Sequence, residues 1–313
     1  MARYQRAHSS SLALIAAAAS WGTATAISKR AVDEVPPLTL LPIELAISVA
    51  VLGVAMRFSR RPLALSPELR QLGYLGVLNP GVSYALSLAG LARITASTSV
   101  LLWAAEPVLI LVLAYLMLRD RASPALVGCA GAALIGVTLV VAQPGRHGSA
   151  LGVALTLAGV AACAAYTVLS TQLLHEESSM SVVLVQQVAA LGFSLVLFAG
   201  SLVVGEPPNL SDVSAAAWAS ALAAGLLYYA LAFWFYVSGL RGVRPGYAGM
   251  FINLVPVFGL AASYALLHER LSPRQAAGAA MILVAVMIIA RLQARAHRRG
   301  PVPLAEHARQ REE

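Results

Sequence analysis

Long apolar stretches, separated by short polar segments, follow one another along almost the whole chain. Windows of about 20 apolar residues have the length of a helix that crosses a hydrocarbon core about 30 Å thick. The pattern predicts ten such helices, at 10–29, 37–57, 71–90, 95–118, 125–142, 150–171, 181–204, 215–238, 246–267 and 275–293. The expected fold class is therefore an all-α integral membrane protein with about ten transmembrane helices.

The composition supports this prediction. Of the 313 residues, 59% are hydrophobic and 12% are charged, and the mean hydropathy is +0.75. A soluble domain carries about 25% charged residues, because its surface has to remain hydrated. With half that share, much of the surface is expected to face lipid.

The net charge of +8 is explained by topology. If the N-terminus is cytoplasmic, sixteen of the 22 Lys and Arg lie on the cytoplasmic side. The six expected outside are Lys29, Arg30, Arg93, Arg146, Arg270 and Arg274. This split obeys the positive-inside rule and places both termini in the cytoplasm. The basic residues therefore indicate orientation in a membrane, and no nucleic-acid partner is expected.

The chain contains an internal repeat. Shifted by 149 residues, Gly76–Pro124 lies over Gly225–Pro273 without a gap, and the identical pairs include Gly76/Gly225, Pro107/Pro256, Tyr115/Tyr264 and Pro124/Pro273. A shift of 143 places Glu44 over Gln187. Five spans per half is an odd number, so the halves enter the membrane from opposite sides, a construction typical of secondary transporters. We expect a first five-helix repeat at 1–143, an outer linker at 144–149, a second repeat at 150–292 and a polar cytoplasmic tail at 293–313.

Several short motifs accompany the repeat: Ser20-Trp21-Gly22, the helices around Pro107 and Pro256, and the close of each half at 119–124 and 268–275. In these features the chain resembles the drug/metabolite transporter superfamily, specifically the EamA-type ten-helix permeases. The resemblance implies gradient-linked movement of small metabolites, often export of amino acids or related compounds, and a central cavity between the halves. Glu44 departs from the pattern, since members of the family often have an Arg near this position.

Two carboxylates, Glu106 and Glu44, lie deep within predicted spans. A charge there costs roughly 2.5–3.5 kcal/mol on insertion scales, so it needs a cavity or a partner. Glu106 precedes Pro107, which removes a backbone hydrogen bond, and it is expected to share a helical face with Trp103. The alternatives are a protonated Glu106 bonded to a neighbouring helix and a Glu44 that pairs with an Arg at a helix end.

Polar and aromatic stripes mark further cavity candidates. The third span carries Asn79 on a stripe of small polar residues, and the eighth carries Tyr228 on an aromatic one, at helical steps of three and four. Aromatic rings suit apolar or cationic solutes, although a packed or lipid-facing cluster gives the same pattern. The same place in the second half holds Asn253, Val255 and Pro256, so the repeat has no second carboxylate there. The candidate substrate- or proton-binding residues are Glu106, Glu44, Trp103, Asn79, Tyr228 and Asn253.

No phosphate-binding G-x-x-x-x-G-K-[ST], H-E-x-x-H or G-x-S-x-G sequence occurs. We therefore expect no enzyme, no cofactor and no metal, and protons are the expected coupling ion. The predicted function is a permease of the bacterial cytoplasmic (inner) membrane that moves small organic metabolites by alternating access, as an exporter. The alternatives are an uptake permease or exchanger without proton coupling, a membrane-embedded enzyme acting on lipid-linked substrates, and a membrane scaffold.

Overall fold

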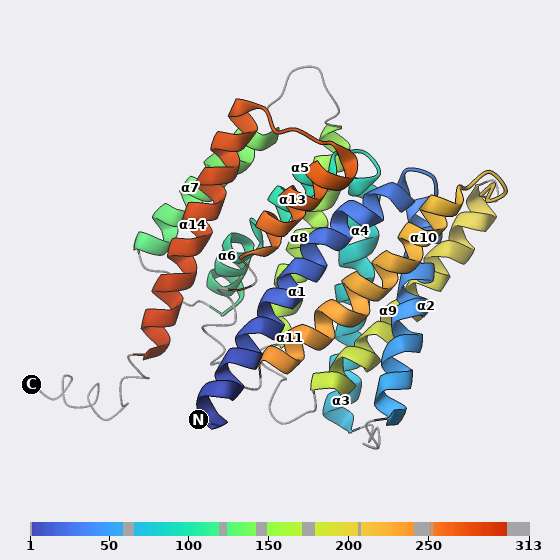
Figure 1. The fold of residues 1–313 in the computed structure, drawn as a ribbon, viewed down its shortest axis with the longest axis horizontal. Coiled ribbons are helices and arrows are strands. Elements are labelled where there is room, and N and C mark those ends of the chain that lie inside the picture. Colours follow the sequence, from blue (N-terminus) through green and yellow to red (C-terminus); the bar gives the residue numbers. More distant parts are fainter. Residues whose placement is uncertain are drawn as a thin grey trace, which may run out of the picture.

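The computed structural model describes residues 2–58, 66–118, 124–141, 149–170, 179–205, 208–240, 251 and 253–298, and these residues form helices joined by short turns (Figure 1). The helices of the first half are α1 (Ala2–Val32), α2 (Pro37–Phe58), α3 (Pro67–Gly76), the π-helical η1 (Val77–Val82), α4 (Ser83–Leu91), α5 (Ala96–Trp103), α6 (Glu106–Leu118) and α7 (Pro124–Val141). Those of the second half are α8 (Ala150–Ser170), α9 (Ser179–Val204), α10 (Ala215–Ala224), the π-helical η2 (Gly225–Leu231), α11 (Ala232–Leu240), α13 (Val255–Leu267) and α14 (Pro273–Arg298).

Where the structure describes them, the ten predicted spans overlap with helices, the ninth only from Val255 onward apart from residue 251. Three of them consist of consecutive helical elements: α3, η1 and α4; α5 and α6; and α10, η2 and α11. Within the described residues, seven helical stretches are long and apolar enough to cross a membrane, and Val255–Leu267 and Pro273–Ile289 are shorter apolar helices. The ninth predicted span is described only at 251 and from 253 onward, and the predicted linker (except 149) and the tail beyond 298 lie outside the described residues.

The first helix of each half packs against the later helices of the other half. Helix α1 of the first half packs against α10, α11 and α13 of the second half. Helix α8 of the second half correspondingly packs against α4, α5 and α6 of the first half. The pairs α2–α9 and α7–α14 each join one helix from either half. Because α1 and α8 run in opposite directions, as do α2 and α9 (Figure 1), the second half has the inverted orientation that an odd number of spans requires.

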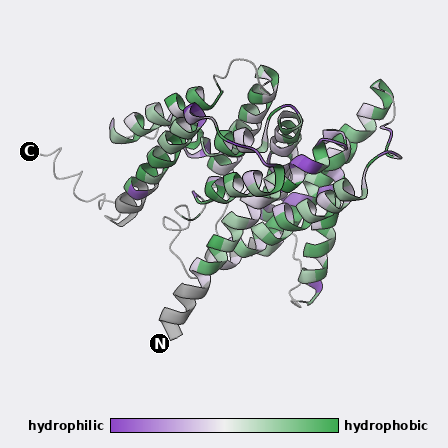
Figure 2. Cartoon of the chain, turned by 45° about the horizontal axis from the view of Figure 1, so that its top comes forward, coloured by the Kyte–Doolittle hydropathy of each residue, from purple (hydrophilic) through white to green (hydrophobic). Residues whose placement is uncertain are grey.

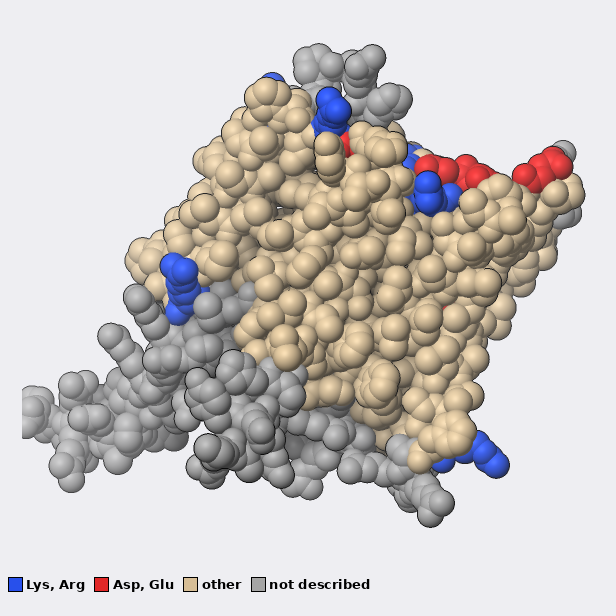
Figure 3. Space-filling model, in the orientation of Figure 1, with Lys and Arg blue, Asp and Glu red and all other residues tan. Residues whose placement is uncertain are grey.

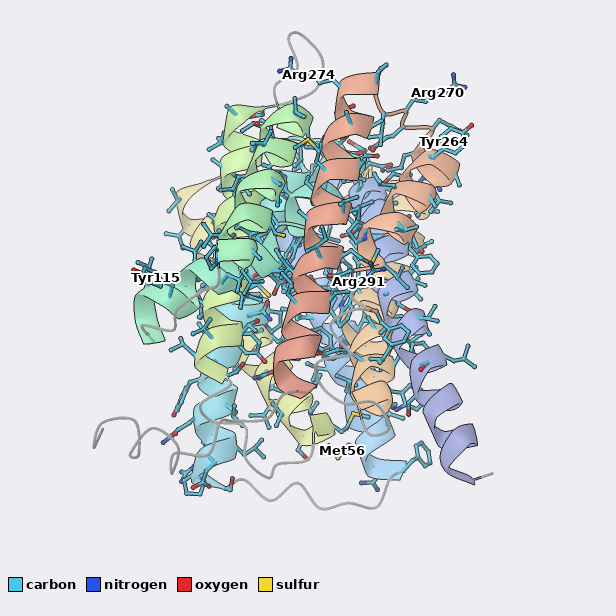
Figure 4. All side chains as sticks on the ribbon, turned by 90° about the vertical axis from the view of Figure 1, so that its left-hand side faces the viewer. Met56, Tyr115, Tyr264, Arg270, Arg274 and Arg291 are labelled. Atoms are coloured by element: carbon cyan, nitrogen blue, oxygen red, sulfur yellow. The ribbon has the colours of Figure 1, made fainter. Side chains whose placement is uncertain are left out.

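Two other features follow the repeat. The shift of 149 residues places η1 within η2, so both halves contain a π-helical segment in the same span. Tyr115 and Tyr264, which are equivalent under that shift, are 56% and 59% exposed and lie on opposite sides of the molecule in Figure 4. These positions are those expected for two structurally related halves.

The surface has the character of a membrane protein. On the face drawn in Figure 3, Lys, Arg, Asp and Glu gather towards the upper and lower ends, with a wide band between them that is almost free of charge. Hydrophilic positions collect near the connecting segments in Figure 2, whereas the helices are mostly hydrophobic. The exposed large apolar side chains include Leu116, Val127 and Val196, as expected where lipid covers the surface.

Glycines allow the closest helix crossings between spans. A Cβ on Gly90 of α4 would lie 2.7 Å from the carbonyl oxygen of Gly152 on α8. A Cβ on Gly239 of α11, the equivalent of Gly90, would lie 2.9 Å from the carbonyl oxygen of Ser10 on α1. Small residues at these crossings are the usual means by which membrane helices bring their backbones together.

Two carboxylates tie the halves together at the upper end in Figure 1. Glu269, which follows α13, accepts hydrogen bonds from the backbone N–H groups of Ala96 (2.9 Å) and Ser97 (2.8 Å) at the start of α5. Glu34, which follows α1, accepts them from the backbone N–H (2.7 Å) and the hydroxyl (2.8 Å) of Ser214, the N-cap of α10. A carboxylate at a helix N-terminus satisfies unpaired N–H groups and complements the helix dipole.

Candidate functional site

A small cavity lies between the two halves at the level of η2. Its volume is about 20 Å³, which is room for about one water molecule. Its walls come from α1, α2, α4 and α5 of the first half and from η2 of the second. The lining residues are Thr25, Ser28, Glu44, Tyr84, Ser87, Leu88, Leu91, Ser99, Trp103, Tyr228 and Tyr229. The halves are therefore closed around this site in the structure.

Glu44 of α2 supplies the carboxylate of the cavity. Its side chain is 1% exposed, and Oε1 accepts a hydrogen bond of 2.8 Å from the hydroxyl of Ser28 on α1. The Tyr229 side chain lines the same cavity and interacts with this carboxyl group. Burying a carboxylate is costly unless hydrogen bonds, a proton or a cation compensate. Ser28 and Tyr229 offer neutral hydroxyl groups, so a ligand that carries a positive charge can still neutralise the Glu44 carboxylate.

An aromatic wall faces this carboxylate, and Tyr84 of α4 is its centre. The Tyr84 ring centroid lies 5.2 Å from that of Tyr228, edge to face, 5.2 Å from that of Tyr229 and 5.6 Å from that of Trp103. Aromatic pairs prefer such edge-to-face and tilted arrangements. A cation above these rings gains about 0.5–2 kcal/mol from their quadrupoles. Carboxylate and rings together suit a ligand that carries an ammonium group on an apolar body.

The π-helical turn of η2 explains why two consecutive tyrosines both line the cavity. In a regular α-helix neighbouring side chains point about 100° apart, so Tyr228 and Tyr229 would face different surroundings. A π-turn adds one residue to the turn and redirects the side chains within it, and such turns are common at functional sites. The helical spacing of the eighth span predicts Tyr228 in the cavity but gives no signal for the π-turn.

Glu106 lies apart from the cavity lining. Ala104 and Ala105 form a turn between α5 and α6, because Pro107 has no N–H to continue the helical hydrogen bonds. The face expected to join Trp103 to Glu106 is therefore broken: Trp103 lines the cavity, whereas the Glu106 carboxylate accepts a 3.3 Å hydrogen bond from the Cys163 thiol of α8. Cys163 is thus a hydrogen-bond donor.

The other predicted site residues are distributed as follows. Asn79 is 6% exposed and sits in η1 with non-helical backbone angles (φ −144°, ψ 119°), and its Oδ1 is buried without a hydrogen-bond partner among the described residues. Asn253 lies in the turn before α13 and is partly buried. Neither belongs to the residues that line the cavity. Glu44, Trp103 and Tyr228 are the three predicted residues that the structure brings together.

Tyr84, Leu88 and Leu91 are among the lining residues that the sequence did not single out. Tyr84, Leu88 and Leu91 follow one another at steps of four and three, and all three face the cavity with Ser87. This helical stripe lies directly beside the polar stripe through Asn79 and Ser83 that drew attention first. The spacing was therefore a signal, but an apolar stripe in a membrane span is usually packing or lipid contact.

Comparison with known proteins gives three findings. The EamA-like transporter family matches residues 8–142 and again residues 150–291. An uncharacterized transporter from Archaeoglobus fulgidus is 23% identical over 272 residues, which are 87% of this chain and 95% of the relative. A crystal structure of a protein 20% identical in sequence superposes with a TM-score of 0.63 and covers 91% of this chain and 98% of its own; at this identity it shows a shared fold.

Proposed function

The chain belongs to the EamA-like transporter family, is a multi-pass membrane transporter, and from this premise we propose that it exports small organic metabolites across the cytoplasmic membrane of a bacterium. The proposed substrates carry an ammonium group, as amino acids and related amines do. The proposed mechanism is alternating access, in which the interface between the halves opens to one side of the membrane at a time.

The buried Glu44 carboxylate beside the aromatic rings of Tyr84 and Tyr228 carries this proposal. The pair offers the two kinds of interaction that favour an ammonium group, charge neutralisation and cation–π attraction. The site lies between α2 and η2, one element from each half, so a movement of one half against the other changes access to it. This placement is where inverted-repeat transporters bind their substrates.

The closed cavity fits an intermediate of such a cycle. Sites that hold small molecules typically have about 300–1,000 Å³, far more than the ~20 Å³ found here. The halves therefore have to separate before a metabolite enters. Since the two halves make equivalent contacts, separation is available at either membrane face.

Proton exchange supplies the energy in this proposal. The ammonium group binds to the deprotonated Glu44 from the cytoplasm, and after outward opening a proton replaces it on the carboxylate. The protonated carboxyl is neutral, so the empty transporter returns without leaving a buried charge in the membrane. One proton enters for each ammonium compound exported, and the site is never occupied by both.

Reconstitution in proteoliposomes tests the proposal. Radiolabelled amino acids and methylammonium serve as solutes, with and without an imposed pH gradient, and counterflow without a gradient separates proton coupling from simple exchange. We expect gradient-driven accumulation by the wild type and its loss in Glu44→Gln. Glu68→Gln, at the start of α3, is the matched control and retains transport. Gradient-driven accumulation by Glu44→Gln at the wild-type rate would overturn the proposal.

A screen in cells identifies which compounds are candidate substrates and in which direction they are moved. Overexpression should confer resistance to toxic amino-acid analogues or toxic organic cations if the direction is export. Increased sensitivity to the same compounds would instead identify an uptake permease. Glu44→Gln serves in this screen as the inactive reference, compared at equal membrane abundance.

A further inference from the structure

Gln187 of α9 is a buried amide whose two ends are both occupied. It is 1% exposed, and its Oε1 accepts a hydrogen bond from the hydroxyl of Ser48 on α2. Its Nε2 donates a 2.8 Å hydrogen bond to the backbone carbonyl oxygen of Tyr229 in η2. Gln187 thus connects α9 to both elements that carry the Glu44 site.

These connections form a closed ring across the interface between the halves. Glu44 and Ser48 are four residues apart, one helical turn of α2. The Tyr229 side chain meets the Glu44 carboxyl group in the shared cavity, while the Tyr229 carbonyl accepts from Gln187, which in turn accepts from Ser48. A ring made of these two hydrogen bonds, the helical turn of α2 and the cavity contact restricts each of its members more than isolated pairs would.

The π-turn of η2 makes this support necessary. An inserted residue weakens the regular ladder of backbone hydrogen bonds, and side chains that reach the backbone stabilise such interruptions. Without the bond from Gln187, the turn that aims the Tyr229 hydroxyl is held by its own backbone and by ring packing alone. The orientation of that hydroxyl therefore depends on an amide from a different helix.

We propose that Gln187 is a positioning residue that sets the Tyr229 hydroxyl against the Glu44 carboxylate by clamping η2 to α2. The proposal rests on the proposed role of Glu44 in transport. It also explains an asymmetry of the repeat, because the shift of 143 residues superposes Gln187 on Glu44. One half supplies the carboxylate at this place, and the other supplies the amide that holds it in position.

The test measures Glu44 directly, without a transported solute. Purified protein in the Glu106→Gln background is treated with dicyclohexylcarbodiimide, which modifies carboxyl groups in apolar surroundings, and modification of the peptide that contains Glu44 is followed by mass spectrometry. We expect Gln187→Met to increase the labelling rate by about threefold or more, because the Tyr229 hydroxyl no longer covers the carboxylate. Tyr229→Phe is expected to give the same increase, and the double variant no more than Tyr229→Phe alone, the non-additivity of residues that act in series.

Gln186→Met is the matched control. Gln186 is the neighbouring residue on α9, is 4% exposed, and accepts a 3.0 Å hydrogen bond from the Tyr166 hydroxyl on α8, outside the ring. Its replacement is expected to leave the labelling of Glu44 within twofold of the background. Ser48→Ala removes the hydrogen bond from Ser48 to Gln187 and leaves the sequence of α9 unchanged. It is therefore expected to accelerate labelling even where Gln187→Met fails to fold. Ser48→Thr keeps the hydroxyl and is expected to restore the slow rate.

Three results would overturn the proposal: an unchanged rate in both Gln187→Met and Ser48→Ala, additive effects of Gln187→Met and Tyr229→Phe, or an equal acceleration by Gln186→Met. The outcome is independent of the transport assay. If Glu44→Gln transports normally but the labelling behaves as expected, the proposed function fails and the positioning role stands. If Glu44→Gln loses transport but the labelling rates do not change as expected, the positioning role of Gln187 fails and the proposed function stands.

Discussion

The hydroxyl of Ser28 on α1 donates a 2.8 Å hydrogen bond to Glu44 Oε1 on α2, so two consecutive spans of the first half jointly hold the buried carboxylate. Ser28 is 3% exposed and also lines the cavity. Loss of this donor would leave a buried acceptor without its partner, which is costly for a charged and for a neutral carboxyl group. Ser28 therefore matters both for stability and for the state of the site.

Replacing Ser28 by Ala is expected to lower the free energy of unfolding by about 1–3 kcal/mol, the cost of leaving a buried hydrogen-bond acceptor without its donor. Ser28→Thr keeps the hydroxyl and should lose less. Ser87→Ala is the control, since Ser87 also lines the cavity but its Oγ has no hydrogen-bond partner among the described residues. Denaturation of purified protein in detergent measures all three, and equal losses for Ser28→Ala and Ser87→Ala would contradict the assignment.

The sequence was sufficient for the helical architecture, because the length of an apolar stretch is set by membrane thickness and does not depend on tertiary contacts. It also selected Glu44, Trp103 and Tyr228, whose chemistry is unusual in lipid wherever they point. The shared helical face of Trp103 and Glu106 is absent, since the spacing assumes an unbroken helix and Pro107 ends that continuity. Which side chains meet across the halves, such as Tyr229 and Glu44, depends on a π-turn and on helix crossings that a periodic pattern does not encode.

Glu106 is expected to influence transport although it lies outside the cavity lining. Its carboxylate accepts from the Cys163 thiol, and both groups interact electrostatically with Tyr84, the centre of the aromatic wall. Glu106→Gln should abolish or strongly alter transport while membrane abundance stays near normal. Cys163→Ser keeps a donor at this place and serves as the control, with transport retained. Undiminished transport by Glu106→Gln would exclude a functional role for this carboxylate.

The cap between Glu34 and Ser214 makes stability depend on pH. The backbone N–H of Ser214, and to a lesser degree its hydroxyl, lower the pKa of Glu34 below its ordinary value of 4.5. A lowered pKa in the folded state means that the cap stabilises the protein above the ordinary value and that this contribution is lost as the pH falls through the lowered pKa. Glu34→Gln should therefore unfold at a lower temperature than the wild type at pH 7.

This difference should shrink as the pH is reduced towards 3, because the wild type then loses its cap as well. Thermal unfolding in detergent, measured across this range, gives the comparison. Ser214→Ala removes the hydroxyl, which also caps α10 by accepting from the backbone N–H of Ala217, so part of its loss at pH 7 should persist at pH 3. A difference between wild type and Glu34→Gln that is constant with pH would show that the carboxylate charge is not involved.

Gly225 at the start of η2 is expected to tolerate no side chain. A Cβ there would lie 2.9 Å from the carbonyl oxygen and 3.1 Å from the Cα of Glu44, so α2 would have to move and take the carboxylate with it. Gly225→Ala should cost roughly 1–3 kcal/mol, as overpacking does, and should impair transport. Gly53→Ala on the same helix α2 meets no atom within 4 Å and should be neutral or stabilise by about 0.5–1 kcal/mol. Similar effects of the two variants on stability would contradict the close crossing.

The positions of the two ends of the described chain give a prediction about topology. α1 begins and α14 ends towards the same side of the molecule (Figure 1), as an even number of spans requires. Arg and Lys are concentrated on the loops of that side in the sequence, so the positive-inside rule predicts that this side is cytoplasmic. Alkaline phosphatase fused at either terminus should therefore be inactive and a fluorescent protein there should fluoresce, whereas phosphatase inserted at 144–149 should be active. Opposite behaviour at the two termini would require an odd number of spans, and two five-helix halves would then be wrong.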